Sequence, residues 1–114
     1  MCIRDSLGAE VIALPASWND GPGKVRQWQT LVSARALDST CVIAAVDAAR
    51  PGGAKAAGKD EGPTGAGHSM LVNADGGVIA SAGYDPQLLV ADVDIAEVER
   101  IRRSIPVLEI RDQG

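Results

Sequence analysis

The sequence contains no phenylalanine, one histidine and two cysteines, and its longest apolar runs (residues 11–16 and 41–46) are six residues long. Two distant cysteines form no disulfide framework, and together with a single histidine they supply no metal-ligand cluster. Six apolar residues are far fewer than the ~20 that cross a bilayer. A formal net charge of −4 offers no basic surface for nucleic acid. We therefore expect a cytoplasmic protein with no metal, cofactor, membrane or nucleic-acid partner.

The apolar residues that are present are small. Of the 114 residues, 18 are alanine and 27 are valine, isoleucine or leucine. This length suits one small domain, and small domains leave a large share of their surface exposed. The composition therefore predicts a thin core of short branched side chains.

The first half of the chain has the pattern strand, helix, strand. Residues 11–14 are continuously apolar, which predicts a strand covered on both faces and ended by Pro15. Residues 41–46 predict a second buried strand. The segment between them, residues 24–37, carries apolar residues at helical spacing: Val25, Trp28, Leu31, Val32 and Ala36. This order predicts a βαβ-like unit in a mixed or parallel sheet.

The second half predicts a hairpin, a strand and a helix. Residues 70–72 and 78–80 flank a turn signal at 73–77, and residues 88–93 are a candidate last strand. Asp94 is placed to cap a helix over residues 95–104, with Glu97 at the position of a capping-box partner. The glycine-rich stretch 48–67 is too long for a routine connection, so it is either a functional loop or mobile.

Several motifs resemble functional sites only superficially. Residues 53–60 nearly form a phosphate-binding loop, but Asp60 stands where Ser or Thr should reach the magnesium. His68 and Ser69 are adjacent in sequence, and we favour a polar strand entry over a catalytic pair. Cys41 lies in an apolar strand, where a thiol is normally inert. We expect Trp28 in the core, whereas Trp18 at the exit of a strand could line a cleft.

Taken in order, these segments resemble the nitrilase superfamily of carbon–nitrogen hydrolases. GAEVIALPASW at residues 8–18 resembles the strand and loop that follow the family's nucleophile, and residues 28–45 resemble its next helix and strand. GHSMLV and GGVIA resemble its next hairpin, and residues 89–94 with the charged helix resemble its closing strand and C-terminal helix. The GHSM form is closer to the deaminated-glutathione and ω-amidase type than to true nitrilases. The resemblance implies an α/β fold, here the C-terminal half of an αββα sandwich.

The resemblance also implies hydrolysis of a small non-peptide amide by a Glu–Lys–Cys triad without a cofactor. In that family the cysteine attacks the carbonyl, the glutamate moves protons and the lysine stabilises the oxyanion. The glutamate and lysine motifs belong upstream of every residue present here. Cys2 does not match the nucleophile, because only five residues separate it from Gly8 and the family places a helix there. We therefore assign no catalytic residue in this chain.

We interpret residues 1–6 as a non-native leader, 7–94 as hydrolase domain and 95–114 as C-terminal helix and tail. The predicted function is that of a carbon–nitrogen hydrolase fragment, acting on small amides through a cysteine thioester when complete and inactive alone. Trp18, His68 and the 48–67 loop are candidates for the rim of the substrate pocket, and the complete protein is expected to be a homo-oligomer. The alternative is a non-enzymatic interaction module that retains half of the fold and binds a partner through its exposed sheet edge.

Overall fold

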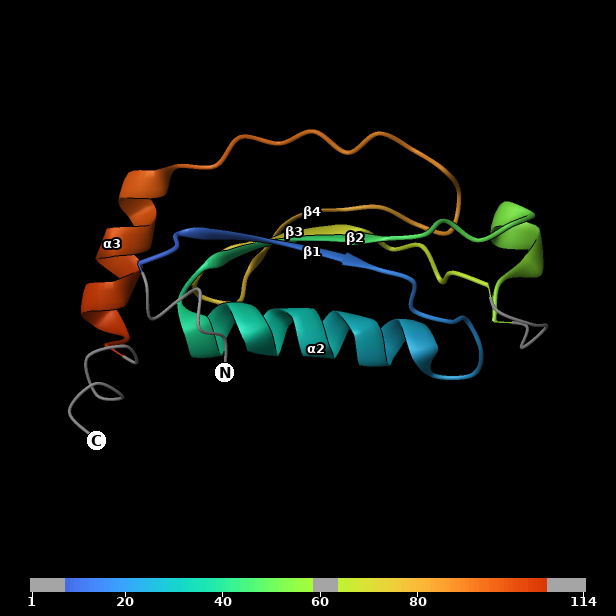
Figure 1. The fold of residues 1–114 in the computed structure, drawn as a ribbon, viewed down its shortest axis with the longest axis horizontal. Coiled ribbons are helices and arrows are strands. Elements are labelled where there is room, and N and C mark those ends of the chain that lie inside the picture. The colour runs from blue at the N-terminus through green and yellow to red at the C-terminus, as the bar shows by residue number, and fades with distance from the viewer. Residues whose placement is uncertain (1–7, 59–63, 107–114) are drawn as a thin grey trace.

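The chain begins with two parallel strands joined by a helix. In the computed structural model, which describes residues 8–58 and 64–106, β1 (Val11–Ala16) leads through α2 (Lys24–Ser39) into β2 (Val42–Asp47). β1 and β2 pair in parallel, with Val11 opposite Val42 (Figure 1). The predicted βαβ unit is confirmed. The leader prediction for residues 1–6, including Cys2, falls outside the described residues and stays a prediction.

The sheet continues as an antiparallel hairpin. β3 (Met70–Val72) pairs with β2, and β4 (Val78–Ser81) pairs with β3, so the strand order is β1-β2-β3-β4. The backbone N–H of Asn73 donates to the Gly77 carbonyl at 2.7 Å and closes the turn. The hairpin prediction is therefore confirmed.

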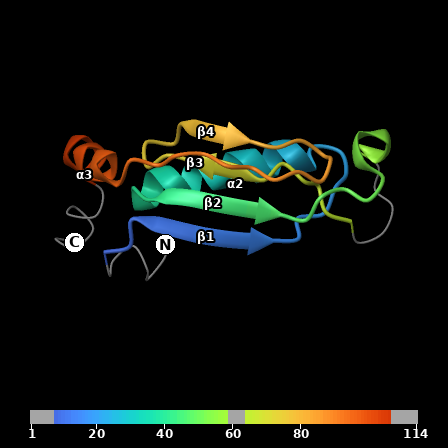
Figure 2. The ribbon, with the colours of Figure 1, turned by 90° about the horizontal axis from the view of Figure 1, so that it is seen from above.

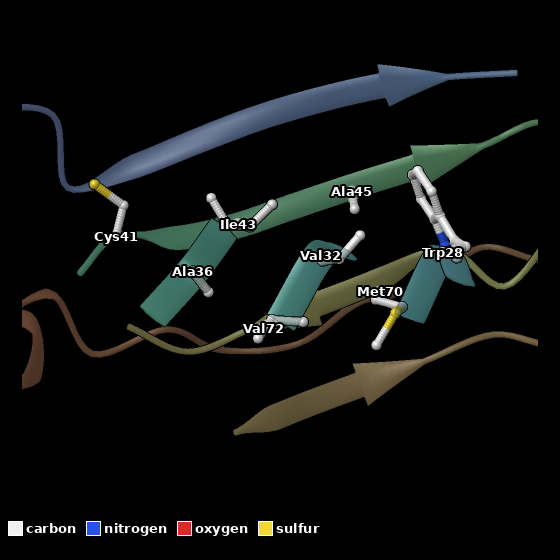
Figure 3. Packing of buried hydrophobic residues seen from close by; sticks show 8 residues of the cluster. All are labelled: Trp28, Val32, Ala36, Cys41, Ile43, Ala45, Met70 and Val72. Carbon is white, nitrogen blue, oxygen red and sulfur yellow. The ribbon is translucent and has the colours of Figure 1, made fainter. Parts of the chain in front are cut away.

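Helix α2 covers one face of the sheet, and the main core lies between them (Figures 1 and 2). Trp28, Val32 and Ala36 are four residues apart and therefore share one side of the helix. They are at most 1% exposed. Figure 3 shows them packed with the inward side chains of β2 and β3: Ile43, Ala45, Met70 and Val72. The helix extends two residues beyond the predicted end and stops at Thr40, which adopts a left-handed conformation with φ 49°.

The other face of the sheet is only partly covered. Helix α3 (Ile95–Ser104) packs Val98 and Ile101 against Val42, at one end of the sheet. Further along β2, Val46 is 58% exposed. β1 alternates between exposed and half-buried residues, so the prediction that it is covered on both faces is wrong for this chain. It is an edge strand with β2 on one side, and α2 covers only its inward-facing residues.

The predicted strand at residues 88–93 does not form. These residues run over the face opposite α2, from β4 to α3, without pairing with any described strand (Figure 1). The apolar composition of the segment does have a high propensity for a strand. A strand also needs a neighbour that satisfies its backbone N–H and C=O groups, and the described part of the chain places none beside it.

Two smaller predictions also change at element ends. β1 does not stop at Pro15 but continues to Ala16, which is possible because a proline is tolerated in an edge strand. Asp94 caps α3 as predicted, with its Oδ1 accepting from the Ala96 N–H at 3.0 Å. Glu97 does not complete a capping box, because its Oε1 instead accepts from the Asn73 side chain at 3.4 Å.

Candidate active-site edge of the sheet

The carboxyl ends of the two parallel strands carry the first candidate, Trp18. Its backbone N–H donates to Oδ1 of Asp47, the last residue of β2, at 2.6 Å. Its indole Nε1 donates to the Lys24 carbonyl at 2.9 Å, and its ring centroid lies 6.2 Å from that of Trp28. Trp18 is therefore held half-buried at this edge, between the end of β1 and the start of α2.

Asp47 connects three segments that meet there. Besides Trp18, its carboxylate accepts from the Ala66 N–H at 3.2 Å, and its own N–H donates to Ser69 Oγ at 3.1 Å. The residue is 5% exposed. Burial raises the pKa of Asp47 from its usual value, while the N–H donors and His68 oppose that shift. Sequence reasoning missed this residue, because an aspartate at the end of an apolar run also fits an exposed turn.

The second candidate, His68, lies at the entry of β3 on the same edge. The backbone N–H of Ala66, two residues before it, donates to the Trp18 carbonyl at 2.7 Å, so both predicted rim residues are tied to one strand end. His68 Nδ1 lies 2.8 Å from the Ala66 carbonyl. Because a carbonyl can only accept, Nδ1 carries the proton, and a neutral His68 would present Nε2 as an acceptor.

The backbone around His68 is constrained. Gly67 has φ +65°, and a Cβ added there would lie 2.6 Å from the Gly83 carbonyl oxygen, so only glycine fits. His68 follows with φ 59°, its carbonyl accepts from Trp28 Nε1 at 2.8 Å, and its ring packs edge-on against Tyr84 at 4.5 Å. The prediction of a polar strand entry matches its position, and the surrounding contacts fix its orientation.

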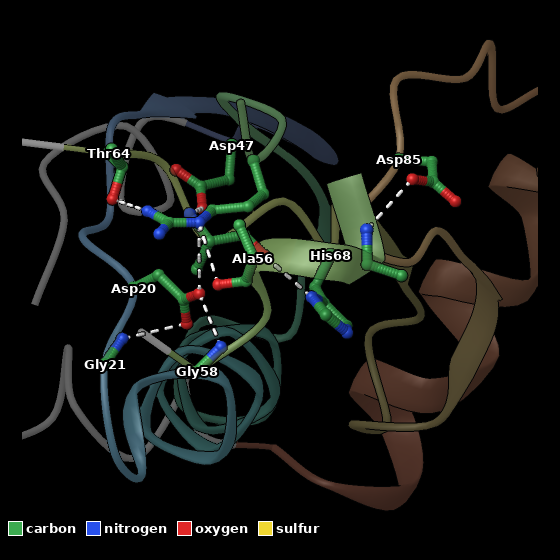
Figure 4. Close-up of polar contacts among 11 residues, drawn as sticks. Asp20, Gly21, Asp47, Ala56, Gly58, Thr64, His68 and Asp85 are labelled. Atoms are coloured by element: carbon green, nitrogen blue, oxygen red, sulfur yellow. Dashed lines mark hydrogen bonds and ion pairs between the residues drawn. The ribbon is translucent and has the colours of Figure 1, made fainter. Parts of the chain in front are cut away.

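A buried ion pair fastens the 48–67 loop to the loop after β1. Arg50 Nε lies 3.6 Å from Asp20 Oδ2, and the two side chains are 2% and 0% exposed (Figure 4). The Asp20 carboxylate also accepts from the N–H groups of Gly21 and Gly58, each at 2.8 Å. The Arg50 guanidinium donates to Thr64 Oγ1 and to the Ala56 carbonyl. The described parts of this loop are therefore anchored, and nothing in their glycine-rich sequence indicated the pair.

The same edge does not fit phosphate. Residues 53–56 form a single short turn, η1 (Gly53–Ala56), and the Ala54 N–H already donates to the Asp85 carboxylate at 3.1 Å (Figure 4). A carboxylate at this position repels a second anion. This agrees with the interpretation of residues 53–60 as a compositional match; Asp60 itself falls outside the described residues.

The only cysteine among the described residues, Cys41, lies away from this edge. Cys41 is fully buried at the amino end of β2, with its Sγ 3.1 Å from the Ala9 carbonyl and 3.4 Å from Arg102 Nη2. Asp47 closes the same strand, so at about 3.3 Å per residue the two ends are roughly 20 Å apart. Across residues 8–58 and 64–106, no group of three metal-ligating side chains gathers, and no helix is long and apolar enough to cross a membrane.

Comparison with known proteins identifies the class. The profile of the carbon-nitrogen hydrolase family matches residues 3–103, and the chain belongs to this family, within the nitrilase superfamily. In solved structures, the C. elegans NitFhit protein superposes with a TM-score of 0.75 at 26% identity, over 92% of this chain and 24% of that one. The mixed sheet with α2 on one face is thus the α/β fold of this superfamily.

The most similar relatives that we compared indicate which branch of the family the chain resembles. It is 48% identical to Hydrolase Rv0480c of Mycobacterium tuberculosis, over 89% of this chain and 37% of that protein. It is 36% identical to the deaminated glutathione amidase of Escherichia coli O157:H7, over 91% of this chain and 35% of the amidase. The resemblance to small-amide hydrolases is confirmed, and the chain spans only about a third of the length of these relatives.

Proposed function

We propose that this chain is the C-terminal part of an amidase that acts on small non-peptide amides through a cysteine thioester. The observation that carries the proposal is the family match over residues 3–103, together with an amidase relative at 36% identity. We assign to the complete protein a small amide as substrate, a homo-oligomeric state and a cytoplasmic location. The activity belongs to the complete domain, and this chain supplies one side of its substrate pocket.

The proposed contribution of this chain is the rim of the substrate pocket. Trp18 offers an apolar surface, and His68 offers Nε2 as a hydrogen-bond acceptor for an amide N–H. Asp47 and the Asp20–Arg50 pair hold the segments that carry them, through the contacts described above. A rim fixed in this way orients a small polar substrate without contributing a reacting group.

On this proposal the chain has no amidase activity by itself. The only cysteine among its described residues, Cys41, is fully buried and lies at the opposite end of β2 from the rim. The test is an assay of ammonia release from a small ω-amide, with the purified chain at high concentration and with a Cys2→Ala variant. We expect no turnover above the buffer rate for either protein. Turnover that Cys2→Ala abolishes would overturn the proposal.

The uncovered sheet face also favours the second candidate, a module that binds a partner without catalysis. Val46 on this face is 58% exposed, which is unusual for a strand residue in a chain with so small a core. Cooperative unfolding of the isolated, soluble chain would favour the module. Aggregation would favour a domain part whose apolar face needs the rest of the domain.

A further inference from the structure

A lysine ammonium lies over Trp18 at the candidate active-site edge. Lys24 is the first residue of α2, and its Nζ lies 5.8 Å from the centroid of the Trp18 ring. This distance is within the ~6 Å at which a cation interacts with an aromatic face. The Lys24 carbonyl also accepts from the Trp18 indole Nε1 at 2.9 Å. The ammonium and the indole are therefore held together by a hydrogen bond and a cation–π contact.

Lys24 has no carboxylate partner among the described residues. The ion pairs within residues 8–58 and 64–106 all use arginine, and they join Arg35 to Asp38, Arg50 to Asp20 and Arg100 to Asp94. The Lys24 side chain is half-buried, so its ammonium is still reached by water. A charge of this kind can pair with a ligand without first breaking an internal ion pair.

The two buried carboxylates of this edge are already engaged. The Asp20 carboxylate faces Arg50 at 3.6 Å and accepts from two backbone N–H groups. The Asp47 carboxylate accepts from the backbone N–H groups of Trp18 and Ala66. Because Asp20 compensates Arg50, the charge of Lys24 is the one left to act on a ligand beside Trp18.

The place of Lys24 in its helix is electrostatically unfavourable. The amino end of a helix carries a positive partial charge, so an acidic residue stabilises the first turn and a cation destabilises it. Helix α2 has no acidic residue in its first turn, and Gly23 at its N-cap provides no side-chain hydrogen bond. The sequence therefore places a cation where the helix itself favours an anion, and an anionic group bound by Lys24 would relieve this conflict.

We propose that Lys24 is a specificity-determining residue that binds a carboxylate of the substrate, so that the complete enzyme selects amides carrying a carboxylate over neutral amides. The proposal rests on the proposed function for the amide part of the substrate. Trp18 covers the aliphatic part of such a molecule, and Lys24 Nζ donates to its carboxylate. Because Lys24 is only half-buried, the pair gains selectivity rather than tight binding.

The experiment follows the NMR signal of the Trp18 indole N–H in the full chain during titration with two probes. Glutaramate carries an amide and a carboxylate, whereas its methyl ester carries the same amide and no charge. We expect glutaramate to bind about three- to fivefold more tightly than the ester, the contribution of one partly exposed ion pair. The net charge of −4 repels an anionic probe, so a preference for glutaramate has to arise locally. Added salt should reduce the preference, because it screens exposed charges.

Two variants of Lys24 and one matched control assign the preference to a residue. Lys24→Met removes the charge, keeps the aliphatic part of the side chain, and should make the affinities for the two probes equal. Lys24→Arg keeps the charge and should keep a preference for glutaramate. Arg26→Met removes an exposed cation two residues further along α2 and should leave the preference unchanged. Neither side chain is buried, so the circular dichroism of each variant should match that of the parent chain.

The outcomes separate this inference from the proposed function. Equal affinities of the parent chain for the two probes, no shift of the Trp18 signal with either probe, or a preference that Lys24→Met leaves intact overturns the inference. So does an equal loss in Arg26→Met, which would show diffuse attraction, or an equal weakening of both probes by Lys24→Met, which would show that Lys24 only holds Trp18. None of these measurements involves hydrolysis. The proposed function is overturned instead by ammonia release that Cys2→Ala abolishes, so either can fail without the other.

Discussion

The buried pair of Asp20 and Arg50 makes a quantitative prediction about stability. Arg50→Met removes the guanidinium and leaves the Asp20 carboxylate buried, with its side chain 0% exposed. Removing one member of a buried ion pair costs about 3–5 kcal/mol, because the remaining charge is uncompensated. Two N–H donors, from Gly21 and Gly58, still reach this carboxylate at 2.8 Å, so we expect the lower end, about 3 kcal/mol.

The double variant separates the ion pair from its surroundings. Asp20→Asn should also destabilise the folded chain. The amide nitrogen of the new asparagine would face an N–H group, Gly21 or Gly58, from which a carboxylate oxygen of Asp20 accepts a hydrogen bond. Combining Asp20→Asn with Arg50→Met removes both charges, so the loss should be smaller than the sum of the single losses by about 0.5–3 kcal/mol. Arg35→Met is the control, because the Arg35–Asp38 pair is 54% and 43% exposed and should contribute at most about 1 kcal/mol.

Urea denaturation followed by circular dichroism measures these differences in the free energy of unfolding. Proteolysis of the native state adds a local measure, since Arg50 ties the 48–58 segment to Thr64. Cleavage in this segment should speed up in Arg50→Met and not in Arg35→Met. An Arg50→Met loss below about 1 kcal/mol, or single losses that simply add, would refute the reasoning.

Two further predictions concern the same edge. Gly65→Ala should destabilise the folded chain strongly or prevent folding, because the added Cβ would lie 2.0 Å from the Ala48 carbonyl oxygen. Gly83→Ala is the control, because a Cβ added at Gly83 meets nothing within 4 Å. Equal melting temperatures for the two variants would contradict the prediction. Burial raises the pKa of Asp47, so the folded state binds its proton more tightly than the unfolded chain and stability from this group falls as pH rises above about 3.9. The free energy of unfolding of Asp47→Asn should therefore increase relative to that of the parent protein from acid to neutral pH. A difference between the two proteins that does not change with pH would contradict this prediction.

Much of the local structure could be predicted because its causes are local. The four-residue spacing of Trp28, Val32 and Ala36 indicated both the helix and its buried side. The turn residues at 73–77 indicated the hairpin, and Asp94 indicated the start of α3. Each of these signals lies within a few residues of the structure that it specifies.

The anchoring of the candidate site could not be predicted in the same way. Trp18 and Asp47 are 29 residues apart, and Asp20 and Arg50 are separated by a helix and a strand, so no local pattern pairs them. The place of Trp18 at the exit of a strand indicated that it lines a cleft, and the family resemblance led us to expect both Trp18 and His68 at a pocket rim. The structure brings both to one sheet edge, and their contact with substrate stays a proposal.

The sequence by itself determined the four described strands, the two described α-helices, their order and the family, because periodicity, turn residues and ordered motifs are properties of neighbouring residues. Tertiary structure alone decided which faces are covered. Residues 88–93 have the composition of a strand, yet they pair with no described strand. Composition records what a segment could bury, whereas pairing and burial depend on which other segments the fold brings beside it.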